Sequence, residues 1–528
     1  MNIRKSEVQS MSANEIDAAL YGTQGREVRH RKKNLRKAMR MLTFQQNSLF
    51  TANVRVGMSS KADNINCLIL GGAGTGKSRS FIIPNLIQMN CNPVITDPKG
   101  EILKKTGQLL RDNGYDVRVL DLIHHNKSHC YNPFAYFRND DDILMFVNNM
   151  WDAMEDKTAQ KGDPIWPEQA KNLMLSLCYY LFHFAPKAEQ NMDMVITMAN
   201  AITSSDEKKN PDAVAMLFEA IEDKNDTAYT YYTAWSVAQD VTLTSILTTF
   251  KSRMAVFNLE SMKKLTYTDE IGIRDLASGK VAIFMVIPDN TKVYNFIAGT
   301  LYTQMFQQLY DLADNFYNGP LPRPVRFFMD EFANIALPDD YNTILSTSRS
   351  RNISFIIVLQ NKQQIEAIFE KYYQNIYGNC AFYLFLGSME LETCKYYSEL
   401  LGEETIIVTN WTKNYGRNGG SSKQEQKTAR KLLDPSELRG LSGKDPRLCV
   451  LYTKMGVCLD YKYDMSKHPL YHKLADKPGD TPYDWGYAPV LLPGGLSMLP
   501  QNYHGPVART PMVHGELLDP EEIERMIS

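Results

Sequence analysis

Eight consecutive residues near the start of the chain have the types and spacing of a phosphate-binding loop. They fit the pattern G-x-x-x-x-G-K-[ST] at every fixed position and read Gly71, Gly72, Ala73, Gly74, Thr75, Gly76, Lys77 and Ser78. Glycines let backbone N–H groups curl around phosphates, Lys77 can reach the β and γ oxygens, and the Ser78 hydroxyl can ligate Mg²⁺. A strand-like apolar run precedes the octet and a helical pattern follows it. A chance Gly-rich match would lack that context, so the octet predicts a nucleotide site.

A second run supplies the carboxylates that nucleotide hydrolysis needs. Residues 325–329 form an apolar, strand-like stretch that ends in Asp330 and Glu331, the Walker B pattern. We expect Asp330 to hold Mg²⁺ through its water shell, and Glu331 to orient and polarise the attacking water. An Asp-Glu pair after a strand is commonly just a solvated turn, so this interpretation depends on the phosphate loop. The GTPase signature N-K-x-D lacks its aspartate at residues 361–364, which favours ATP.

The elements that must position these residues follow an α/β pattern. Strands are expected at 65–70, 93–97 and 116–120, with helices at 78–90 and 100–113 between them. Strand-like runs return at 281–287, 325–329, 353–359 and 381–386. Between them lie long helical periodicities, at 143–151, 168–184, 193–202, 212–222 and 231–257. The pattern predicts one ATPase sheet that carries an all-α insertion.

These patterns divide the chain into five parts. We expect an N-terminal basic arm at 1–58, a nucleotide-binding domain in two parts at 59–138 and 273–475, an inserted all-α domain at 139–272, and a Pro-rich C-terminal tail at 476–528. The insertion explains the long separation between Lys77 and Asp330.

Composition bounds the remaining possibilities. The chain has 528 residues, 44% of them hydrophobic, and a net charge of -2, so it is globular without an overall basic surface. Its eight cysteines form no C-x-x-C pair and lie mostly in apolar runs, which indicates reduced core thiols and no zinc site. No signal peptide is recognisable and no apolar stretch reaches about 18 residues, so we expect a soluble polypeptide.

Three segments lie outside the ATPase pattern. Residues 26–40 hold eight Arg and Lys against one acid, and could bind nucleic acid or an anionic membrane, or be a solvated basic arm. Residues 411–431 are polar, mildly basic and rich in Gly and Ser, which is typical of a mobile loop, either a disordered one or one that contacts DNA. Residues 478–528 hold eight prolines and are expected to be extended and mobile, with a short helix starting near 519–522.

Several short motifs together resemble one family. They are Pro84-Asn85 after the phosphate loop, Asp97-Pro98-Lys99-Gly100-Glu101, Tyr131-Asn132-Pro133-Phe134, Asp330-Glu331-Phe332-Ala333-Asn334, Ser348-Arg349-Ser350-Arg351-Asn352, Leu359-Gln360-Asn361, and Leu432-Leu433-Asp434-Pro435-Ser436-Glu437-Leu438. With the helical insertion, the chain resembles the type IV secretion coupling proteins, which are conjugative DNA-transfer ATPases. The resemblance runs from about residue 60 to 475.

The resemblance implies a RecA-like nucleotide domain, a homo-hexameric ring, and transfer of a relaxase–DNA complex into a secretion channel. It makes Gln360 a sensor of the γ-phosphate or water, although a capping glutamine at a strand end is the alternative. It makes Arg349 or Arg351 an arginine finger that reaches a neighbour's ATP, against the alternative of two surface arginines. Asp97, Lys99 and Glu101 have either a coupling role or a structural role in a turn.

The N-terminus departs from the family pattern, because members commonly begin with a transmembrane hairpin and this chain does not. Either this is a soluble variant that relies on a separate membrane partner, or the sequence begins downstream of its anchor. We expect the chain in the cytoplasm, peripheral to the inner face of the membrane, and attached there through partner proteins. Residues 26–40 could replace the missing contact.

Three functions remain open on the sequence. The leading hypothesis is an ATP-driven translocase of single-stranded DNA that contacts phosphates in a salt-sensitive way. The alternatives are a nucleotide-gated cargo receptor that does not pump DNA, and a segregation or packaging motor that acts on duplex DNA.

Overall fold

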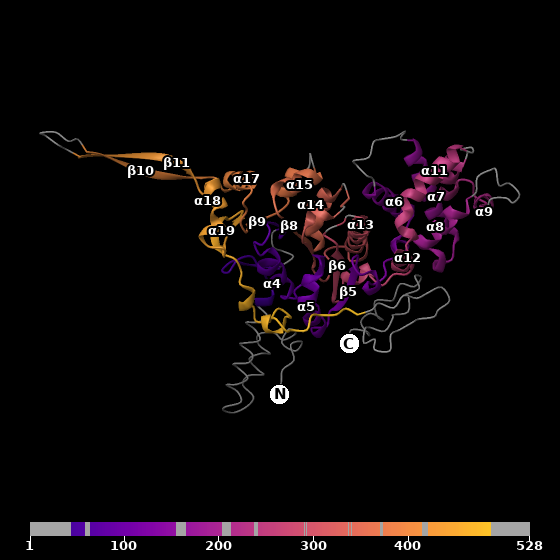
Figure 1. Cartoon of the computed structure of the whole chain (residues 1–528), viewed down its shortest axis with the longest axis horizontal. Coiled ribbons are helices and arrows are strands. Elements are labelled where there is room, and N and C mark those ends of the chain that lie inside the picture. Colours follow the sequence, from indigo (N-terminus) through magenta and orange to yellow (C-terminus); the bar gives the residue numbers. More distant parts are fainter. Residues whose placement is uncertain are drawn as a thin grey trace, which may run out of the picture.

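A mostly parallel sheet forms the centre of the molecule (Figure 1). The computed structural model describes residues 44–58, 64–154, 165–202, 213–236, 241–289, 291, 293–335, 337–338, 340–369, 373–413 and 421–486. Within them, nine strands follow the order β13-β12-β9-β3-β8-β7-β4-β6-β5. Neighbours from β9 to β5 are parallel, and the antiparallel hairpin β12–β13 extends the β9 edge. In sheet order the strands are Gly456–Tyr461, Leu448–Thr453, Phe382–Phe385, Cys67–Leu70, Ile353–Leu359, Val325–Met329, Asn92–Pro98, Val281–Ile287 and Asp116–Asp121.

The strands at the centre of the sheet are buried on both faces. The expected strands at 281–287, 325–329 and 353–359 are confirmed as β6, β7 and β8, and every residue of each is buried. Parallel strands covered by helices on both sides show no alternation of polar and apolar residues, which is why these strands are continuous apolar runs. The predicted α/β fold class is confirmed.

Helices cover the two faces of the sheet as separate layers. Leu68 and Leu70 of β3 point into one apolar core, and Cys67 and Ile69 point into the other, because side chains alternate along a strand. On one face lie α13 (Asn295–Asp311), α14 (Tyr341–Thr347), α15 (Lys362–Phe369), α16 (Tyr373–Gly378) and α17 (Leu391–Leu401); on the other lie α4 (Ile83–Leu86) and α5 (Glu101–Asp112) (Figure 1). All eight cysteines are free, and only Cys458 is not fully buried.

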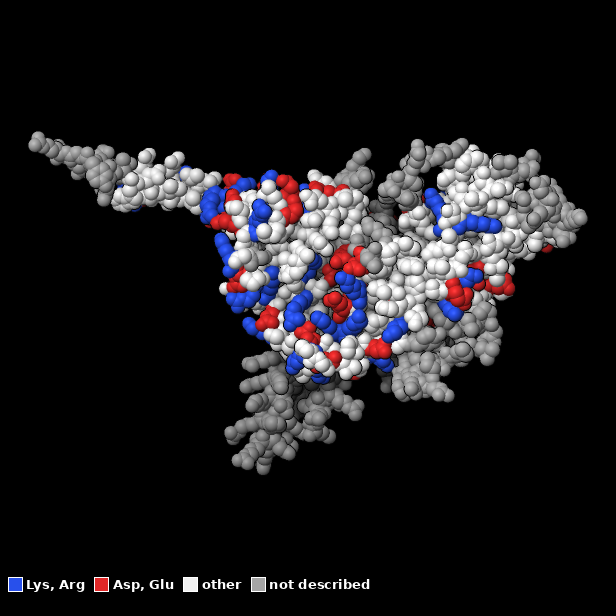
Figure 2. Space-filling model, viewed as in Figure 1, with Lys and Arg blue, Asp and Glu red and all other residues white. Residues whose placement is uncertain are grey.

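The chain between β5 and β6 is helical, and each periodicity expected there contains a helix. The helices are α6 (Asp140–Ala153), α7 (Ile165–Phe184), α8 (Met192–Ala201), α9 (Ala213–Glu219), α10 (Thr227–Ser236), α11 (Val241–Arg253) and α12 (Glu260–Tyr267). They gather around α7 at one end of the molecule, where Figure 2 shows few charged side chains. Among the described residues, no helix is long and apolar enough to cross a membrane.

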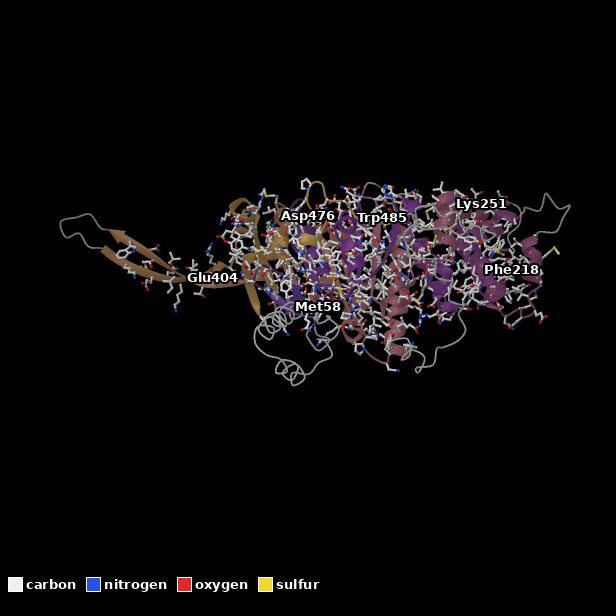
Figure 3. All side chains as sticks on the ribbon, turned by 90° about the horizontal axis from the view of Figure 1, so that it is seen from below. Met58, Phe218, Lys251, Glu404, Asp476 and Trp485 are labelled. Atoms are coloured by element: carbon white, nitrogen blue, oxygen red, sulfur yellow. The ribbon has the colours of Figure 1, made fainter. Side chains whose placement is uncertain are left out.

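A two-stranded ribbon projects from the opposite end of the molecule (Figures 1 and 3). β10 (Glu403–Lys413) pairs in antiparallel register with β11 (Ser421–Lys431), and Trp411 lies opposite Lys423. The expectation of a mobile loop at 411–431 is therefore wrong for both described ends of that segment. The strands could not be recognised in the sequence because their side chains are polar. Two strands that pair through the backbone without a buried face leave no hydrophobic pattern.

Small elements complete the two ends of the described chain. A hairpin, β1 (Asn47–Leu49) and β2 (Arg55–Gly57), precedes the sheet, and α18 (Pro435–Arg439) and α19 (Leu441–Lys444) link the ribbon to β12. Residues 475–486 form a strap that turns at residues 477–480 and packs against α5. Its backbone donates from Ala475 to Lys105 O (3.3 Å) and from Tyr483 to Lys104 O (2.9 Å). The basic arm at 26–40 and tail residues 487–528 lie outside the described residues.

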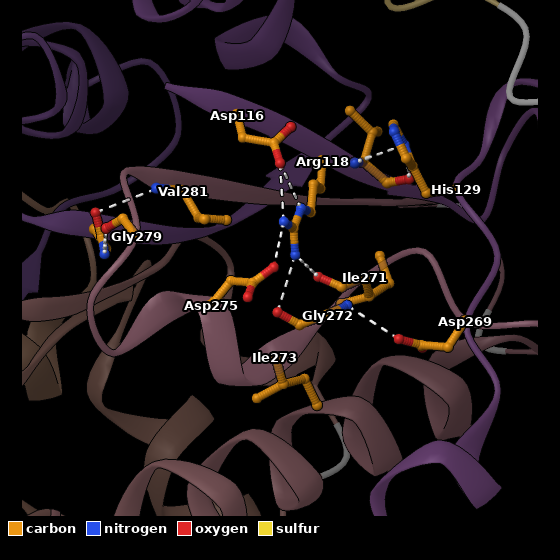
Figure 4. Close-up of polar contacts among 12 residues, drawn as sticks. Asp116, Arg118, His129, Asp269, Ile271, Gly272, Ile273, Asp275, Gly279 and Val281 are labelled. Carbon is orange, nitrogen blue, oxygen red and sulfur yellow. Dashed lines mark hydrogen bonds and ion pairs between the residues drawn. The ribbon is translucent and has the colours of Figure 1, made fainter. Parts of the chain in front are cut away.

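Arg118 on β5 joins the sheet to the segment by which the chain returns from the helices. Its Nη1 donates to the carbonyl oxygens of Ile271 (2.7 Å) and Gly272 (2.9 Å), and its Nη2 pairs with Asp116 (2.8 Å) and Asp275 (2.5 Å) (Figure 4). Gly272 has a φ of 52°, and a Cβ there would lie 2.3 Å from Arg118 Nη1. This network ties β5, which precedes the helical part, to residues 271–275, which follow it.

Candidate nucleotide-binding site

The loop of residues 71–78 is held at the carboxyl end of β3 by its neighbours. Gly71 N–H donates to Leu359 O of β8 (3.1 Å), and Gly72 N–H donates to Gly387 O, just after β9 (2.9 Å). Gly74 and Gly76 have φ angles of 73° and 86°, which side chains other than hydrogen rarely allow. The loop is therefore preformed with its curvature set by glycine.

Lys77 folds back over this loop. Its Nζ donates to the carbonyl oxygens of Gly71 (2.8 Å) and Gly72 (3.1 Å). Burial lowers the pKa of Lys77, while the nearby carboxylates of Asp330 and Glu331 oppose that shift. The ammonium thus has neutral carbonyl acceptors that a stronger, anionic acceptor such as a phosphate can replace.

The helix after the loop is shorter than expected. One π-helical turn, Ser78–Ile82, leads into α4, so the helix ends at Leu86 instead of residue 90. Ile83 N–H donates to Ser78 O, five residues back. Pro84 explains the wider turn, because proline has no N–H to donate to the carbonyl four residues earlier.

A hydrogen bond joins the loop to the acidic strand end. Ser78 Oγ donates to Asp330 Oδ2 at 2.6 Å, across 252 residues of sequence. Burial raises the pKa of Asp330, and the bond from Ser78 and the charge of Lys77 oppose that shift. A hydroxyl and a carboxylate at one point are oxygen ligands that suit Mg²⁺, which takes few protein ligands when a substrate phosphate completes its shell. The described residues include no group of three or more His, Cys, Asp or Glu that could hold a metal without such a phosphate.

Glu331 follows Asp330 in a strained conformation. Its φ is 52°, in the left-handed region that glutamate rarely adopts. The side chain is half-buried, and burial raises its pKa, with a further increase from the charge of Asp330. Strain of this kind persists where the surroundings hold a residue in place, and such places are often functional.

Gln360 lies at the tip of the strand between the phosphate loop and the acidic pair. β8 pairs with β3 on one side, with Leu359 opposite Leu70, and with β7 on the other. The backbone N–H of Gln360 donates to Gln364 Oε1 (2.7 Å), and its half-buried side chain has no hydrogen bond within the described residues. The side-chain amide is therefore available to a ligand.

The two candidate arginines lie at the amino ends of the parallel strands, on the side of the sheet opposite to the phosphate loop. Arg349 and Arg351 belong to a 3₁₀ turn, Ser348–Arg351, which precedes the amino end of β8, whereas the phosphate loop follows the carboxyl end of β3. β8 alone spans about 20 Å, so neither arginine reaches its own phosphate loop. Arg351 pairs with Asp314 (2.6 Å) and stacks over Tyr310 (4.1 Å). Arg349 is exposed and has no ion pair within the described part of the chain.

The Asp97 to Glu101 motif forms the turn after β4, beside Asp330. Asp97 Oδ1 and Oδ2 accept from the backbone N–H groups of Ile102 (3.1 Å) and Leu103 (2.7 Å), which secures the start of α5. Burial raises the pKa of Asp97 to about 7. Lys99 Nζ pairs with Asp289 at 2.8 Å, just after β6. In Figure 2 a group of acidic side chains ringed by basic ones lies where Figure 1 labels β6 and α5.

Two residues near the loop belong to no recognisable sequence pattern. Lys462 follows β13 and donates from Nζ to Thr75 O (2.9 Å), and burial lowers its pKa. Asp476 of the strap pairs with Arg79, directly after Ser78, at 3.0 Å. Only the fold brings these distant segments to the loop.

The strand order, the phosphate loop and the adjacent acidic strand end define a P-loop nucleotide-binding protein with a RecA-like core. The sequence model of one family, described as type IV secretory system conjugative DNA transfer, matches residues 10–455. The chain belongs to this family, and the resemblance in the short motifs is confirmed.

The chain is similar to two curated proteins and to several solved structures. It is 21% identical over 386 residues to the protein VirD4 of Rhizobium rhizogenes, a match that covers 71% of this chain and 55% of VirD4. It thus spans about half the length of the curated relatives that it matches. The plasmid coupling protein TrwB aligns at 15% identity over 81% of this chain and 92% of TrwB, both with the ATP analogue ADPNP (TM-score 0.56) and with ADP and Mg²⁺ (TM-score 0.55). This likeness shows the shared fold.

Proposed function

We propose that this chain is the ATPase of a conjugative type IV secretion system, which recruits the relaxase–DNA complex and drives transfer of single-stranded DNA. One observation carries the proposal: the Ser78–Asp330 hydrogen bond unites the phosphate loop and the acidic strand end in one site. Family membership and the nucleotides bound by TrwB support ATP and Mg²⁺ as the cofactors.

The proposed site uses this chain's groups as follows. The backbone N–H groups of residues 71–78 surround the β- and γ-phosphates, and Lys77 leaves the carbonyls of Gly71 and Gly72 to contact them. Ser78 and Asp330 would hold Mg²⁺, which neutralises charge on the phosphate oxygens when it is bound. No covalent intermediate is needed, because positioning and electrostatics supply most of the rate.

Glu331 and Gln360 prepare the water in this proposal. Glu331 accepts a hydrogen bond from the attacking water, and its raised pKa brings it nearer to the pH at which a general base is effective. Gln360, whose amide has no other partner in the described chain, senses the γ-phosphate or the same water.

We also propose that the site is completed between subunits of a homo-hexamer. Arg349 is the candidate arginine finger. It is exposed, it lies at the amino ends of the strands while its own phosphate loop lies at their carboxyl ends, and it has no ion pair within the described residues. Arg351 is held by Asp314 and Tyr310, which favours a structural role. The ring would work at the inner face of the cell membrane, attached through channel proteins.

The test is ATP turnover by the purified chain, with and without single-stranded DNA, over a salt series. A Glu331→Gln variant provides the blank. Stimulation by single strands that weakens as salt rises supports the DNA motor, because phosphate contacts release counterions. Turnover that ignores DNA would overturn DNA pumping in favour of a cargo receptor, and stimulation only by duplex DNA would favour a segregation or packaging motor.

A further inference from the structure

The β10–β11 ribbon stands away from the body of the protein and buries neither of its faces. Its root is fixed by a backbone bond from Leu432 N–H to Gly402 O (3.0 Å) and by an ion pair of Arg430 with Glu437 (2.7 Å). Each strand has 11 residues, which span about 35 Å. A two-stranded ribbon alone is marginally stable in water, so a ligand on one face would stabilise it.

The two faces of the ribbon differ in chemistry. Directly paired residues share a face, and Trp411 pairs with Lys423, Ile407 with Lys427, and Glu403 with Lys431. The opposite face carries the pairs Val408–Gln426, Asn410–Gln424 and Glu404–Arg430. The first face also carries the pair Thr409–Glu425, so three lysines of β11 lie there with two glutamates beside the tryptophan. The other face also carries Ile406–Thr428, and its one acid and one base cancel.

Trp411 is the dominant feature of the first face. Its side chain is 67% exposed, and Ile407 on the same face is 60% exposed. An indole has more apolar surface than any other side chain, so exposure at the end of a projecting ribbon indicates a partner that covers it.

The charge of the ribbon identifies the class of partner. The two described strands contain five Lys and Arg (413, 423, 427, 430, 431) and three Glu (403, 404, 425), a net charge of +2 in a chain whose net charge is -2. Lys423, Lys427 and Lys431 recur every four residues along the Trp411 face, about 13 Å apart. Lys427 has no ion pair within the described residues, whereas Lys423 pairs with Glu425. A flat aromatic ring between regularly spaced cations suits a polyanion with stacking bases.

We propose that the Trp411 face of the ribbon binds single-stranded nucleic acid, with a base stacked on the Trp411 indole and phosphates on Lys423 and Lys427. The inference rests on the proposed function and adds a contact about 13 Å long away from the nucleotide site. Unpaired bases are required, because only they expose a face to a single indole. Stacking does not distinguish bases, so this contact is independent of sequence.

The test measures binding of a labelled single-stranded oligonucleotide by the full chain, using fluorescence anisotropy without nucleotide. Trp411→Ala is expected to weaken binding by about 5- to 100-fold, whereas Trp411→Tyr, which keeps a stacking ring, retains most of it. Lys423→Gln with Lys427→Gln should make the slope of log affinity against log salt shallower by about 1.4. Gln424→Ala with Gln426→Ala changes the opposite face and should bind as the wild type does.

Intrinsic fluorescence gives a direct readout of stacking. The chain has five tryptophans, and those at 151 and 235 are buried. Single-stranded DNA should quench the wild type more than it quenches Trp411→Phe.

Different failures point to different conclusions. Wild-type affinity in both Trp411→Ala and the double lysine variant would overturn the ribbon site and leave the DNA motor intact. Failure of the wild type to bind any single strand would overturn both. Ribbon-dependent binding of duplex DNA alone would overturn the single-strand assignment. If Trp411→Ala instead lowers the oligomeric state by sedimentation with unchanged DNA affinity, the ribbon binds a second copy of this chain, and the proposal is wrong.

Discussion

Lys77 and Glu331 divide the proposed chemistry between a cation and a carboxylate, so each can be removed without removing the other. We predict that Lys77→Ala lowers ATP turnover by at least about 100-fold, because a preorganised charge facing the phosphates is lost. Glu331→Gln should lower turnover by about 10² to 10⁴ through loss of the base. Steady-state turnover measures both, with Lys104→Ala on the exposed side of α5 as the control. Wild-type turnover in either variant would contradict the site assignment.

Asp97 gives a second prediction, because its pKa is raised to about 7 by burial. The unfolded pKa is about 4, so the folded state holds the proton more tightly, and this carboxyl makes folding less favourable as pH rises from about 4 to about 7. Asp97→Asn cannot ionise. The melting temperature of the variant, compared with that of the wild type, should therefore increase between pH 5 and pH 8.

The control for this prediction is Asp112→Asn at the exposed end of α5, the helix whose first turn Asp97 of β4 binds. A difference in melting temperature that does not change with pH would mean that folding does not raise the pKa of Asp97. The loss of one acceptor for Ile102 and Leu103 affects all pH values alike, so it does not alter the slope.

At the scale of elements, the Arg118 network makes β5 and the 271–275 segment one unit. We predict that Arg118→Met destabilises the protein by about 3 kcal/mol, because it leaves carboxylates and buried carbonyls without their cation. Urea unfolding followed by circular dichroism measures the loss. Arg447→Met removes an exposed ion pair with Asp445 and should change the midpoint much less. Equal shifts in the two variants would show that the network does not hold the junction.

The buried strands could be predicted because burial on both faces leaves an unbroken apolar run in the sequence. β6, β7 and β8 have the expected bounds for this reason. The ribbon strands β10 and β11 could not, since they bury no face and their pairing is made by the backbone. The π-helical turn after the loop was not predicted, because the effect of Pro84 on the turn before it was not anticipated.

Residues of the candidate site that belong to recognisable motifs could be predicted from the sequence, whereas residues that only the fold brings to the site could not. The proximity of Ser78 to Asp330 could be expected, since both motifs follow strands whose carboxyl ends share one sheet edge. The contact of Lys462 with the phosphate loop could not be expected, because a lysine after a hairpin strand has no distinguishing neighbours in sequence. Arg349 and Arg351 could be distinguished only in the structure, because the fold brings Asp314 to Arg351 alone.

At the scale of the whole molecule, an arginine that cannot reach its own phosphate loop predicts complementation between subunits. Arg349→Ala and Glu331→Gln should each be inactive alone, and a mixture should regain part of the turnover, because some interfaces combine an intact loop with an intact finger. Turnover per chain should also rise with protein concentration. Arg351→Ala is the matched control, and we expect it to lower the melting temperature through loss of the Asp314 pair. An inactive mixture with Arg349→Ala would contradict a finger in trans.

The position of β3 between β8 and β9 has a consequence for synthesis of the protein. The phosphate loop emerges from the ribosome before most of the sheet, and its strand acquires both neighbours only after residues 353–385 have been made. Asp330 is synthesised 252 residues after Ser78, which takes about 13 to 50 s of translation at ~5–20 residues per second. The nascent loop is therefore complete in sequence before β8, β9 and Asp330, its neighbours in the folded protein, have been made.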